Sequence, residues 1–168
     1  MKIGILGGSF DPAHKGHLAI SKEARKRFKL EKIIWAITKK NPLKAESKTP
    51  ISKKIKDCKK IIGLNSFIKV KFYENIIKSN KTIDLINYLK KDKNIEIFFL
   101  MGADNLISFH KWHKSKSISK KCNILVFDRH GYKKNSLKSK TFKSLNKDNL
   151  TFIEFKKVNI SSSQLRKI

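Results

Sequence analysis

Short apolar segments alternate with helical patterns along most of this chain, and this alternation limits the fold more than any other feature of the sequence. The apolar segments are rich in Ile, Phe and Leu and have the length of buried strands, as in residues 2–6, 33–37, 67–72, 95–101, 124–127 and 152–155. Between them, apolar residues recur at helical spacing in residues 16–29, 51–62 and 82–90. Strands that alternate with helices form βαβ units. The sequence therefore predicts an α/β fold, a Rossmann-like doubly wound parallel sheet with helices on both faces.

The length and composition favour one folded domain. The chain has 168 residues, of which 39% are hydrophobic, and this is enough to build a core. We therefore expect a single domain over residues 1–168, with the Lys/Ser/Asn-rich segment 132–149 as a loop with weak helix. No apolar run approaches the ~18 residues that cross a bilayer, and the N-terminus reaches glycines too early for a signal peptide. Cys58 and Cys122 do not form a C-x-x-C motif, so we expect both to be structural thiols. Structural thiols suit a reducing compartment. We therefore expect a cytoplasmic location and no membrane partner.

The net charge of +27 raises the question of nucleic-acid binding. Only four of the 40 basic residues are arginine, namely Arg25, Arg27, Arg129 and Arg166, and the lysines are spread along nearly the whole chain. Arginine, with its bidentate fork, is the residue that most often reads bases. We therefore expect no specific nucleic-acid partner, although a basic nucleic-acid-binding module stays open as the non-enzyme alternative. The positive field would instead concentrate anionic substrates.

Three loops are expected at the carboxyl edge of the predicted sheet. They are residues 7–17, 38–44 and 101–113, each of which follows a predicted strand. Ligands of open α/β sheets bind at this edge, where the order of the strands reverses. The sequence therefore places the functional site among these three loops.

The first loop, GGSFDPAHKGH, has the residues of an anion-binding turn. Gly7 and Gly8 let the backbone turn tightly and approach a ligand. His14 and His17 are three residues apart at the start of a predicted helix, where free N–H groups and the helix dipole favour an anion. The loop lacks the P-loop and G-x-G-x-x-G patterns, and two histidines without a carboxylate are poor zinc ligands. We therefore predict phosphate binding and no metal site formed by the protein.

The same residues resemble the nucleotidyltransferase superfamily that carries the H-x-G-H motif. Residues 8–17, GSFDPAHKGH, match its first signature, and residues 160–166, ISSSQLR, match its second, I-S-S-S/T-x-x-R. The resemblance implies that His14, His17 and Arg166 are catalytic. It also implies an ATP site formed by Gly7, Gly8, Ser9, Phe10, His14, His17, Gly102, Asp104, Ser162, Ser163 and Arg166. Mg²⁺ would be carried with the ATP and would need few protein carboxylates.

Further stretches resemble the bacterial nicotinate-nucleotide adenylyltransferases, and this resemblance covers nearly the whole chain. The matching stretches are Asn41-Pro42-Leu43-Lys44, Lys81-Thr82-Ile83-Asp84, the pattern G-A-D-x-L-x-x-F-x-x-W from Gly102 to Trp112, and Arg129-His130-Gly131. The family usually has an aromatic residue before the threonine and a second threonine after the aspartate, where this chain has Lys81 and Leu85. The implied reaction transfers the adenylyl group of ATP to nicotinate mononucleotide and releases pyrophosphate. Pantetheine-phosphate adenylyl transfer stays open as the alternative within the superfamily.

The resemblance also implies roles for residues that would bind the mononucleotide. Trp112 would stack on the pyridine ring, Thr82 would take the nicotinate carboxylate at a helix start, and Lys44 would bind the same substrate. For each of them a structural role stays open: Trp112 as a core residue, Thr82 as an N-cap, and Lys44 as a surface charge. Asp11 is interpreted as a turn residue and Trp35 as a packing residue.

Overall fold

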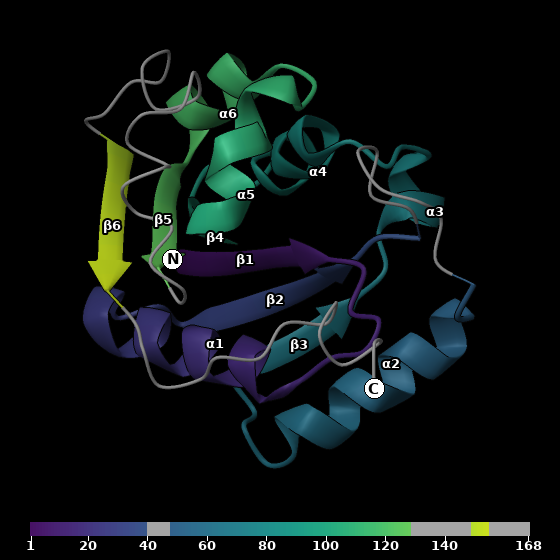
Figure 1. Ribbon diagram of the computed structural model, residues 1–168. Helices are drawn as coiled ribbons and strands as arrows, with labels where there is room; N and C mark the ends of the chain where they lie inside the picture. Colours follow the sequence, from purple (N-terminus) through teal and green to yellow (C-terminus); the bar gives the residue numbers. More distant parts are fainter. Residues whose placement is uncertain (40–47, 129–148, 155–168) are drawn as a thin grey trace.

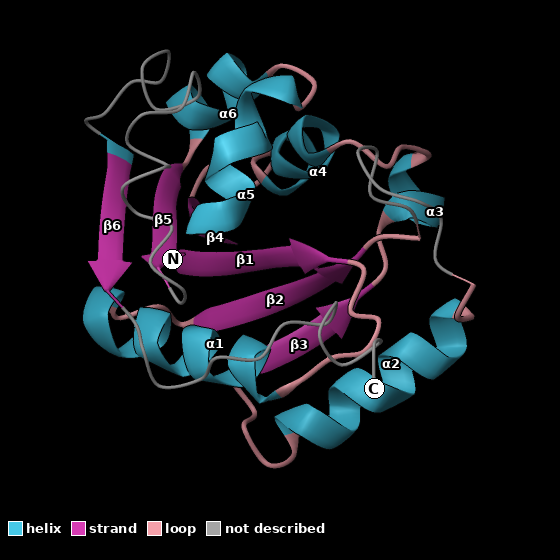
Figure 2. Ribbon diagram, viewed as in Figure 1, coloured by secondary structure: helices cyan, strands magenta, loops and turns pink. Residues whose placement is uncertain are grey.

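The computed structural model describes residues 1–39, 48–128 and 149–154, and in them a six-stranded parallel sheet is flanked by helices on both faces (Figures 1 and 2). The strand order is β3-β2-β1-β4-β5-β6. The strands are β1 (Lys2–Gly8), β2 (Lys32–Ile37), β3 (Ile68–Lys71), β4 (Glu96–Gly102), β5 (Asn123–Asp128) and β6 (Leu150–Glu154). All neighbouring strands pair in parallel. The predicted Rossmann-like α/β fold is confirmed.

The strand order reverses at β1, and this reversal decides which loops meet. From β1 the chain moves outward to β2 and β3, returns to the other side of β1 with β4, and continues to β5 and β6. The segment after β1 and the segment after β4 therefore begin side by side at the carboxyl edge of the sheet. This is the position at which open α/β sheets bind ligands, and two of the three expected loops start there.

The two faces of the sheet bury two separate cores because successive strand residues point to opposite sides. Ile3 and Ile5 of β1 pack in the core beneath α4 (Thr82–Leu89), α5 (Ala103–Ser108) and α6 (Ser115–Lys121). Trp35 of β2 and Phe98 of β4 pack in the opposite core with α1 (Lys15–Phe28) and α2 (Ile51–Ile62). Gly4 faces this second core, where a Cβ would lie only 3.0 Å from Leu30. Figure 1 shows the two helix layers on either side of the sheet.

The longer helices begin and end close to where the sequence predicts. The helix expected over residues 51–62 is observed as Ile51–Ile62, and Gly63 follows it as the C-cap with a φ of 56°, a conformation that glycine adopts without strain. The helix expected over residues 16–29 is α1, whose apolar positions Ile20 and Ala24 are buried. The helix expected over residues 82–90 is α4, which buries Ile83 and Ile86.

Several short elements were not predicted from the sequence. They are α3 (Glu74–Ile77), α5, α6 and a single 3₁₀ turn at Phe109–Lys111. Segment 132–149, expected as a loop, lies outside the described residues except for Asn149. None of the helices described has the length and apolar character that a membrane crossing requires.

Candidate functional site

A buried aromatic side chain holds the turn between β1 and α1. Phe10 is 2% exposed and has a φ of 48°, a left-handed conformation that costs free energy for residues other than glycine. Its ring stacks on Trp35 with 5.2 Å between ring centroids and lies 4.7 Å from the ring of His17. These contacts fix the path of the chain from the end of β1 to the start of α1.

His14 and His17 lock one another at the N-terminus of α1. His14 is the N-cap residue and is only 6% exposed. Its Nδ1 accepts a hydrogen bond from the Gly16 backbone N–H at 3.0 Å, and Nδ1 of His17 accepts one from the His14 backbone N–H at 3.1 Å. The two rings lie 4.0 Å apart. Because Nδ1 is an acceptor in both rings, each neutral imidazole carries its proton on Nε2 and can act as a donor there.

A hydrogen-bonded pair beneath α1 supports the histidines from the core side. The indole N–H of Trp35 donates to Oγ of Ser21 at 2.9 Å, and this hydroxyl donates to the His17 carbonyl oxygen at 2.8 Å. Trp35 and Ser21 are both fully buried. The interpretation of Trp35 as a packing residue is confirmed, whereas sequence reasoning missed Ser21, because a serine inside a helical pattern carries no signal of its own.

Asp11 lies in the turn between Phe10 and Pro12, and its carboxylate accepts a hydrogen bond from the Thr49 hydroxyl at 2.7 Å. This contact ties the turn to the residues that precede α2, in agreement with the interpretation of Asp11 as a turn residue.

The segment after β4 brings an aromatic cluster to the same edge. Gly102 is the buried N-cap of α5, and Asp104 in the first turn of this helix is exposed. Trp112 is partly buried and makes edge-on contacts, with ring centroids 5.9 Å from Phe99 and 5.0 Å from Phe109. Trp112 therefore lies at the border of the core, which leaves the stacking role a prediction.

A pocket opens at the carboxyl ends of β1 and β2, between α3 and the N-terminus of α4. Much of its wall is apolar, and its polar groups come from several loops. The lining residues are Gly7, Ala36, Ile37, Thr38, Tyr73, Glu74, Ile77, Ser79, Asn80, Lys81, Thr82, Leu85 and Phe99. Because Phe99 lines the pocket and also contacts Trp112, the aromatic cluster adjoins it. The structure thus brings Gly7, Thr82 and Trp112 to one region.

Thr82 is the first residue of α4, and the N-cap is Lys81. The alternative that Thr82 is the N-cap is therefore wrong. Thr82 still lines the pocket, and the backbone N–H groups of a first helical turn have no partner within the helix. Together with the positive end of the helix dipole, these groups favour an anion at this end of the pocket.

A buried lysine beside the pocket was not foreseen. Lys54 of α2 is 1% exposed, and its ammonium donates to the Thr38 carbonyl oxygen at 3.3 Å. The charge of Lys54 acts on a second group of this region, the carboxylate of Glu74. This carboxylate accepts a hydrogen bond from the Lys39 backbone N–H at 2.7 Å. Burial raises the pKa of Glu74, and this hydrogen bond and the charge of Lys54 oppose the shift. Oγ1 of Thr38 is buried without a hydrogen-bond partner. No sequence pattern distinguishes Lys54 from the lysines around it.

The two cysteines are not suited to act as nucleophiles. Both are free and buried. Burial raises the pKa of the Cys58 thiol to about 12, and it raises the pKa of the Cys122 thiol to about 12 as well. Because the thiolate is the reactive form, both thiols stay inert at neutral pH, in agreement with the prediction that they are structural.

Some predicted site residues lie outside the described residues. They are Lys44 from the expected loop 38–44, Ser162, Ser163 and Arg166 from the second signature, and the Arg129-His130-Gly131 stretch. The described part of the site therefore has three parts: the segment after β4, the pocket, and the turn between β1 and α1 with His14 and His17, which we call the histidine turn. Among the described residues, no group of three or more His, Cys, Asp and Glu side chains is arranged to hold a metal ion.

A larger cleft, of about 680 Å³, lies at the opposite, amino edge of the sheet. Its cations are Lys22, Arg25, Lys26 and Lys29, and the guanidinium of Arg25 lies 4.4 Å from the ring centre of Phe67. The described part of this cleft has none of the histidines or glycines of the predicted site.

Comparison with known proteins shows the family of the chain. Residues 5–168 match the family described as cytidylyltransferase-like. The chain is 71% identical over 167 residues to a protein of Pelagibacter ubique named "Probable nicotinate-nucleotide adenylyltransferase", covering 99% of this chain and 93% of the relative. A Bradyrhizobium protein of the same name is 36% identical over 77% of this chain and 68% of its own length.

A solved structure shares the fold. It is that of Plasmodium falciparum nicotinic acid mononucleotide adenylyltransferase complexed with NaAD, which matches with a TM-score of 0.80 at 22% identity and covers 99% of this chain and 82% of its own. At this identity the likeness shows the fold, whereas the family match and the relatives show the family. The chain belongs to the cytidylyltransferase-like family and, within it, to the nicotinate-nucleotide adenylyltransferases.

Proposed function

We propose that this chain transfers the adenylyl group of ATP to nicotinate mononucleotide, producing nicotinate adenine dinucleotide and pyrophosphate. The observation that carries the proposal is the histidine turn. Both imidazoles lie at a helix N-terminus and have Nδ1 engaged by a backbone N–H. The proton of each neutral ring is therefore assigned to Nε2. Such a pair supplies fixed hydrogen-bond donors to phosphate oxygens.

The reaction is a direct displacement at phosphorus. An oxygen of the mononucleotide 5′-phosphate forms a bond to the α-phosphorus of ATP, and the bond from this phosphorus to the oxygen that bridges to the β-phosphorus breaks. Pyrophosphate leaves with the electron pair. The attacking phosphate is anionic at neutral pH, so no side chain has to remove a proton. The protein contributes position and stabilisation of the negative charge that moves onto the phosphates.

In this mechanism His14 and His17 donate from Nε2 to phosphate oxygens of ATP. Their rigidity matters because a donor that is already oriented costs no reorganisation when charge develops. The ring of Phe10 is packed on Trp35 and His17, so its contribution to the ATP site is limited to its main chain. Gly7, Gly8 and Ser9 line the same turn and complete this side of the proposed site.

The remaining assignments extend the proposal to both substrates. Gly102 and Asp104 are assigned to ATP, and they follow β4, which pairs with β1 as far as Leu100 and Leu6. Ser162, Ser163 and Arg166 are assigned to the ATP phosphates, with Arg166 as a third catalytic residue. Thr82, Trp112 and Lys44 are assigned to the mononucleotide.

Enzymes of this family generally use a divalent metal ion with ATP, and we propose Mg²⁺ for this chain. Mg²⁺ typically keeps several waters and is held through substrate phosphates and one or two carboxylates. Asp104, after β4, is the described carboxylate assigned to the ATP site. The ion would neutralise phosphate charge, while the chain's own donors orient the triphosphate.

We also propose that residues 1–168 act as a single nucleotidyltransferase domain, since the family match covers residues 5–168. A cytoplasmic location is proposed on the basis of two free, buried thiols, which suit a reducing compartment, and of ATP as the donor substrate.

One assay tests the proposed function. The purified chain is incubated with MgATP and, separately, nicotinate mononucleotide, nicotinamide mononucleotide or 4′-phosphopantetheine, and pyrophosphate and the adenylylated product are measured. We expect the fastest turnover with nicotinate mononucleotide and one pyrophosphate released for each dinucleotide formed. Turnover with phosphopantetheine alone, or no turnover together with salt-sensitive retention on DNA, would overturn the proposal.

A further inference from the structure

The pocket beside the histidine turn carries two opposite charges. Of the described residues that line it, Lys81 is the one cation and Glu74 is the one carboxylate. Between them lie apolar side chains, including Ile77, Leu85 and Phe99. The pocket therefore combines an apolar wall with a positive and a negative group, although the chain as a whole is strongly basic.

The main chain at Lys81 is fixed by its neighbours. Its backbone N–H donates to Oγ of Ser79 at 3.1 Å, and the same hydroxyl donates to Oδ2 of Asp84. The Asp84 carboxylate is thus engaged with Ser79. Lys81 is exposed and is the N-cap of α4, but its side chain makes no capping hydrogen bond. Replacement of this side chain therefore removes a charge from the pocket without removing a cap from the helix.

Glu74 is anchored on the other side of the pocket. Its Oε1 accepts from the Lys39 backbone N–H at 2.7 Å, and the side chain is partly buried at the start of α3. The buried ammonium of Lys54 interacts with it electrostatically. The carboxylate is thus tied to the residues that leave β2.

The base of nicotinate mononucleotide carries the same pair of charges. Its ring nitrogen is cationic because it bears the ribose, and the ring also carries an anionic carboxylate. The base of nicotinamide mononucleotide has the cationic nitrogen but a neutral amide. A pocket with one cation and one carboxylate complements the first base at both charges and the second at only one. A ring bound in the opposite sense would place its carboxylate against Glu74.

We propose that Lys81 is a specificity-determining residue that selects an acceptor whose pyridine ring carries a carboxylate. Its ammonium attracts the carboxylate at the N-terminus of α4, where the backbone N–H groups and the helix dipole act in the same direction. This inference rests on the proposed function, since it names what selects the acceptor in that reaction.

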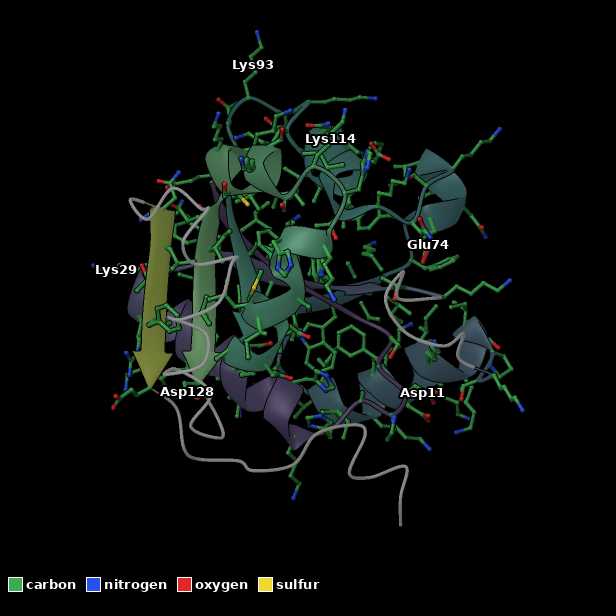
Figure 3. All side chains as sticks on the ribbon, turned by 45° about the horizontal axis from the view of Figure 1, so that its top comes forward. Asp11, Lys29, Glu74, Lys93, Lys114 and Asp128 are labelled. Atoms are coloured by element: carbon green, nitrogen blue, oxygen red, sulfur yellow. The ribbon has the colours of Figure 1, made fainter. Side chains whose placement is uncertain are left out.

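The test compares the selectivity of wild type with that of Lys81→Met, Lys81→Arg and a control, Lys93→Met. Selectivity is the ratio of kcat/KM for nicotinate mononucleotide to kcat/KM for nicotinamide mononucleotide. Lys93 is exposed in the turn before β4 and points away from the molecule (Figure 3), so its replacement removes the same charge from the background field but none from the pocket. Thermal melting of each variant checks that the fold is intact.

We expect Lys81→Met to lower the ratio by about tenfold, the fold-change that a single charge-assisted hydrogen bond typically gives. Lys81→Arg and Lys93→Met should keep the ratio within about twofold of wild type. If wild type turns over nicotinate mononucleotide and Lys81→Met keeps the wild-type ratio, the inference is wrong and the proposed function stands. An equal decrease of this ratio in Lys81→Met and Lys93→Met would also overturn the inference, because the background field would then be the cause. If wild type adenylylates neither mononucleotide, the proposed function itself fails.

Discussion

The two ends of α1 lie at opposite edges of the sheet and differ in the polar side chains that they carry, which are cations at one end and imidazoles at the other. At the C-terminal end the last turn contains Arg25, Lys26 and Arg27, and a cleft of about 680 Å³ lies there. At the N-terminal end lie His14 and His17, near a smaller pocket whose described lining residues include one cation, Lys81, and one carboxylate, Glu74. Among the described residues, the edge with the larger cleft and more cations lining it is thus not the edge with the fixed donors.

Helix electrostatics explains the difference. Cations in the last turn of a helix compensate the partial negative charge of its C-terminus, so the lysines and arginines at that end stabilise α1. At the N-terminus the partial charge is positive and the N–H groups are available to an anion. Among the described residues, the proposed site therefore does not coincide with the densest positive charge. It coincides with a few donors that buried neighbours hold rigidly.

The largest effect is expected from His17→Ala. Loss of one oriented donor should lower kcat by ~10²–10³-fold, while far-ultraviolet circular dichroism and the melting temperature should change little. The matched control is His113→Ala, since His113 is exposed outside the H-x-G-H motif. Turnover of His17→Ala within a few-fold of the control would end the assignment of this histidine.

The next effect concerns the aromatic cluster. Trp112→Ala should weaken binding of nicotinate mononucleotide by roughly 1–3 kcal/mol, the range that base stacking on an aromatic side chain contributes in nucleic-acid sites. The KM for ATP should stay nearly constant. Isothermal titration with each substrate measures the two affinities separately. Equal weakening of both, or a large fall in thermal stability, would favour a core-packing role.

Acceptor choice by the wild-type chain is the third expectation. Nicotinate mononucleotide should be preferred over nicotinamide mononucleotide by at least about tenfold in kcat/KM, because an amide donor facing the N–H groups of α4 leaves buried groups unpaired at a cost of ~1–3 kcal/mol each. Parallel initial-rate kinetics decide this. A preference for the amide would remove carboxylate recognition from the account and leave adenylyl transfer standing.

The smallest effect is expected at the other end of α1. Lys26→Gln should leave kcat/KM within about twofold of wild type, because exposed charges separated by more than a Debye length are largely screened. The free energy of unfolding should fall by ~0.3–1 kcal/mol, because one charge that compensates the helix dipole is lost. Urea denaturation and steady-state kinetics on the same preparation measure both quantities. A tenfold loss of activity would give the amino edge a role in the reaction.

The sequence allowed the prediction of elements that carry strong local signals. The helix Ile51–Ile62 has apolar spacing and a terminating glycine, and β4 is a continuous apolar run. The short helices α3, α5 and α6 were missed because segments of four to seven residues are too short for a helical period to show. The formation of α5 and α6 depends on packing, at Leu106 and Ile118 respectively, which are fully buried.

The sequence singled out some residues of the proposed site for a similar reason. His14, His17, Thr82 and Trp112 belong to patterns of residue type and spacing, and the fold brings them to one edge. The roles of Lys54 and Glu74 depend on contacts between α2, α3 and the end of β2, which no local pattern encodes. The proposed role of Lys81 could not be predicted from the sequence either. Only the structure shows that Lys81 is the one cation among the described residues that line the pocket.

The central claim is that the histidine turn and the pocket bring two substrates together for one direct displacement. The most direct test uses the Sp diastereomer of ATPαS with nicotinate mononucleotide and determines the configuration at the α-phosphorus of the product. A single in-line attack inverts the configuration at this phosphorus, and we predict inversion. Retention would require two successive displacements through an adenylylated enzyme and would contradict the account.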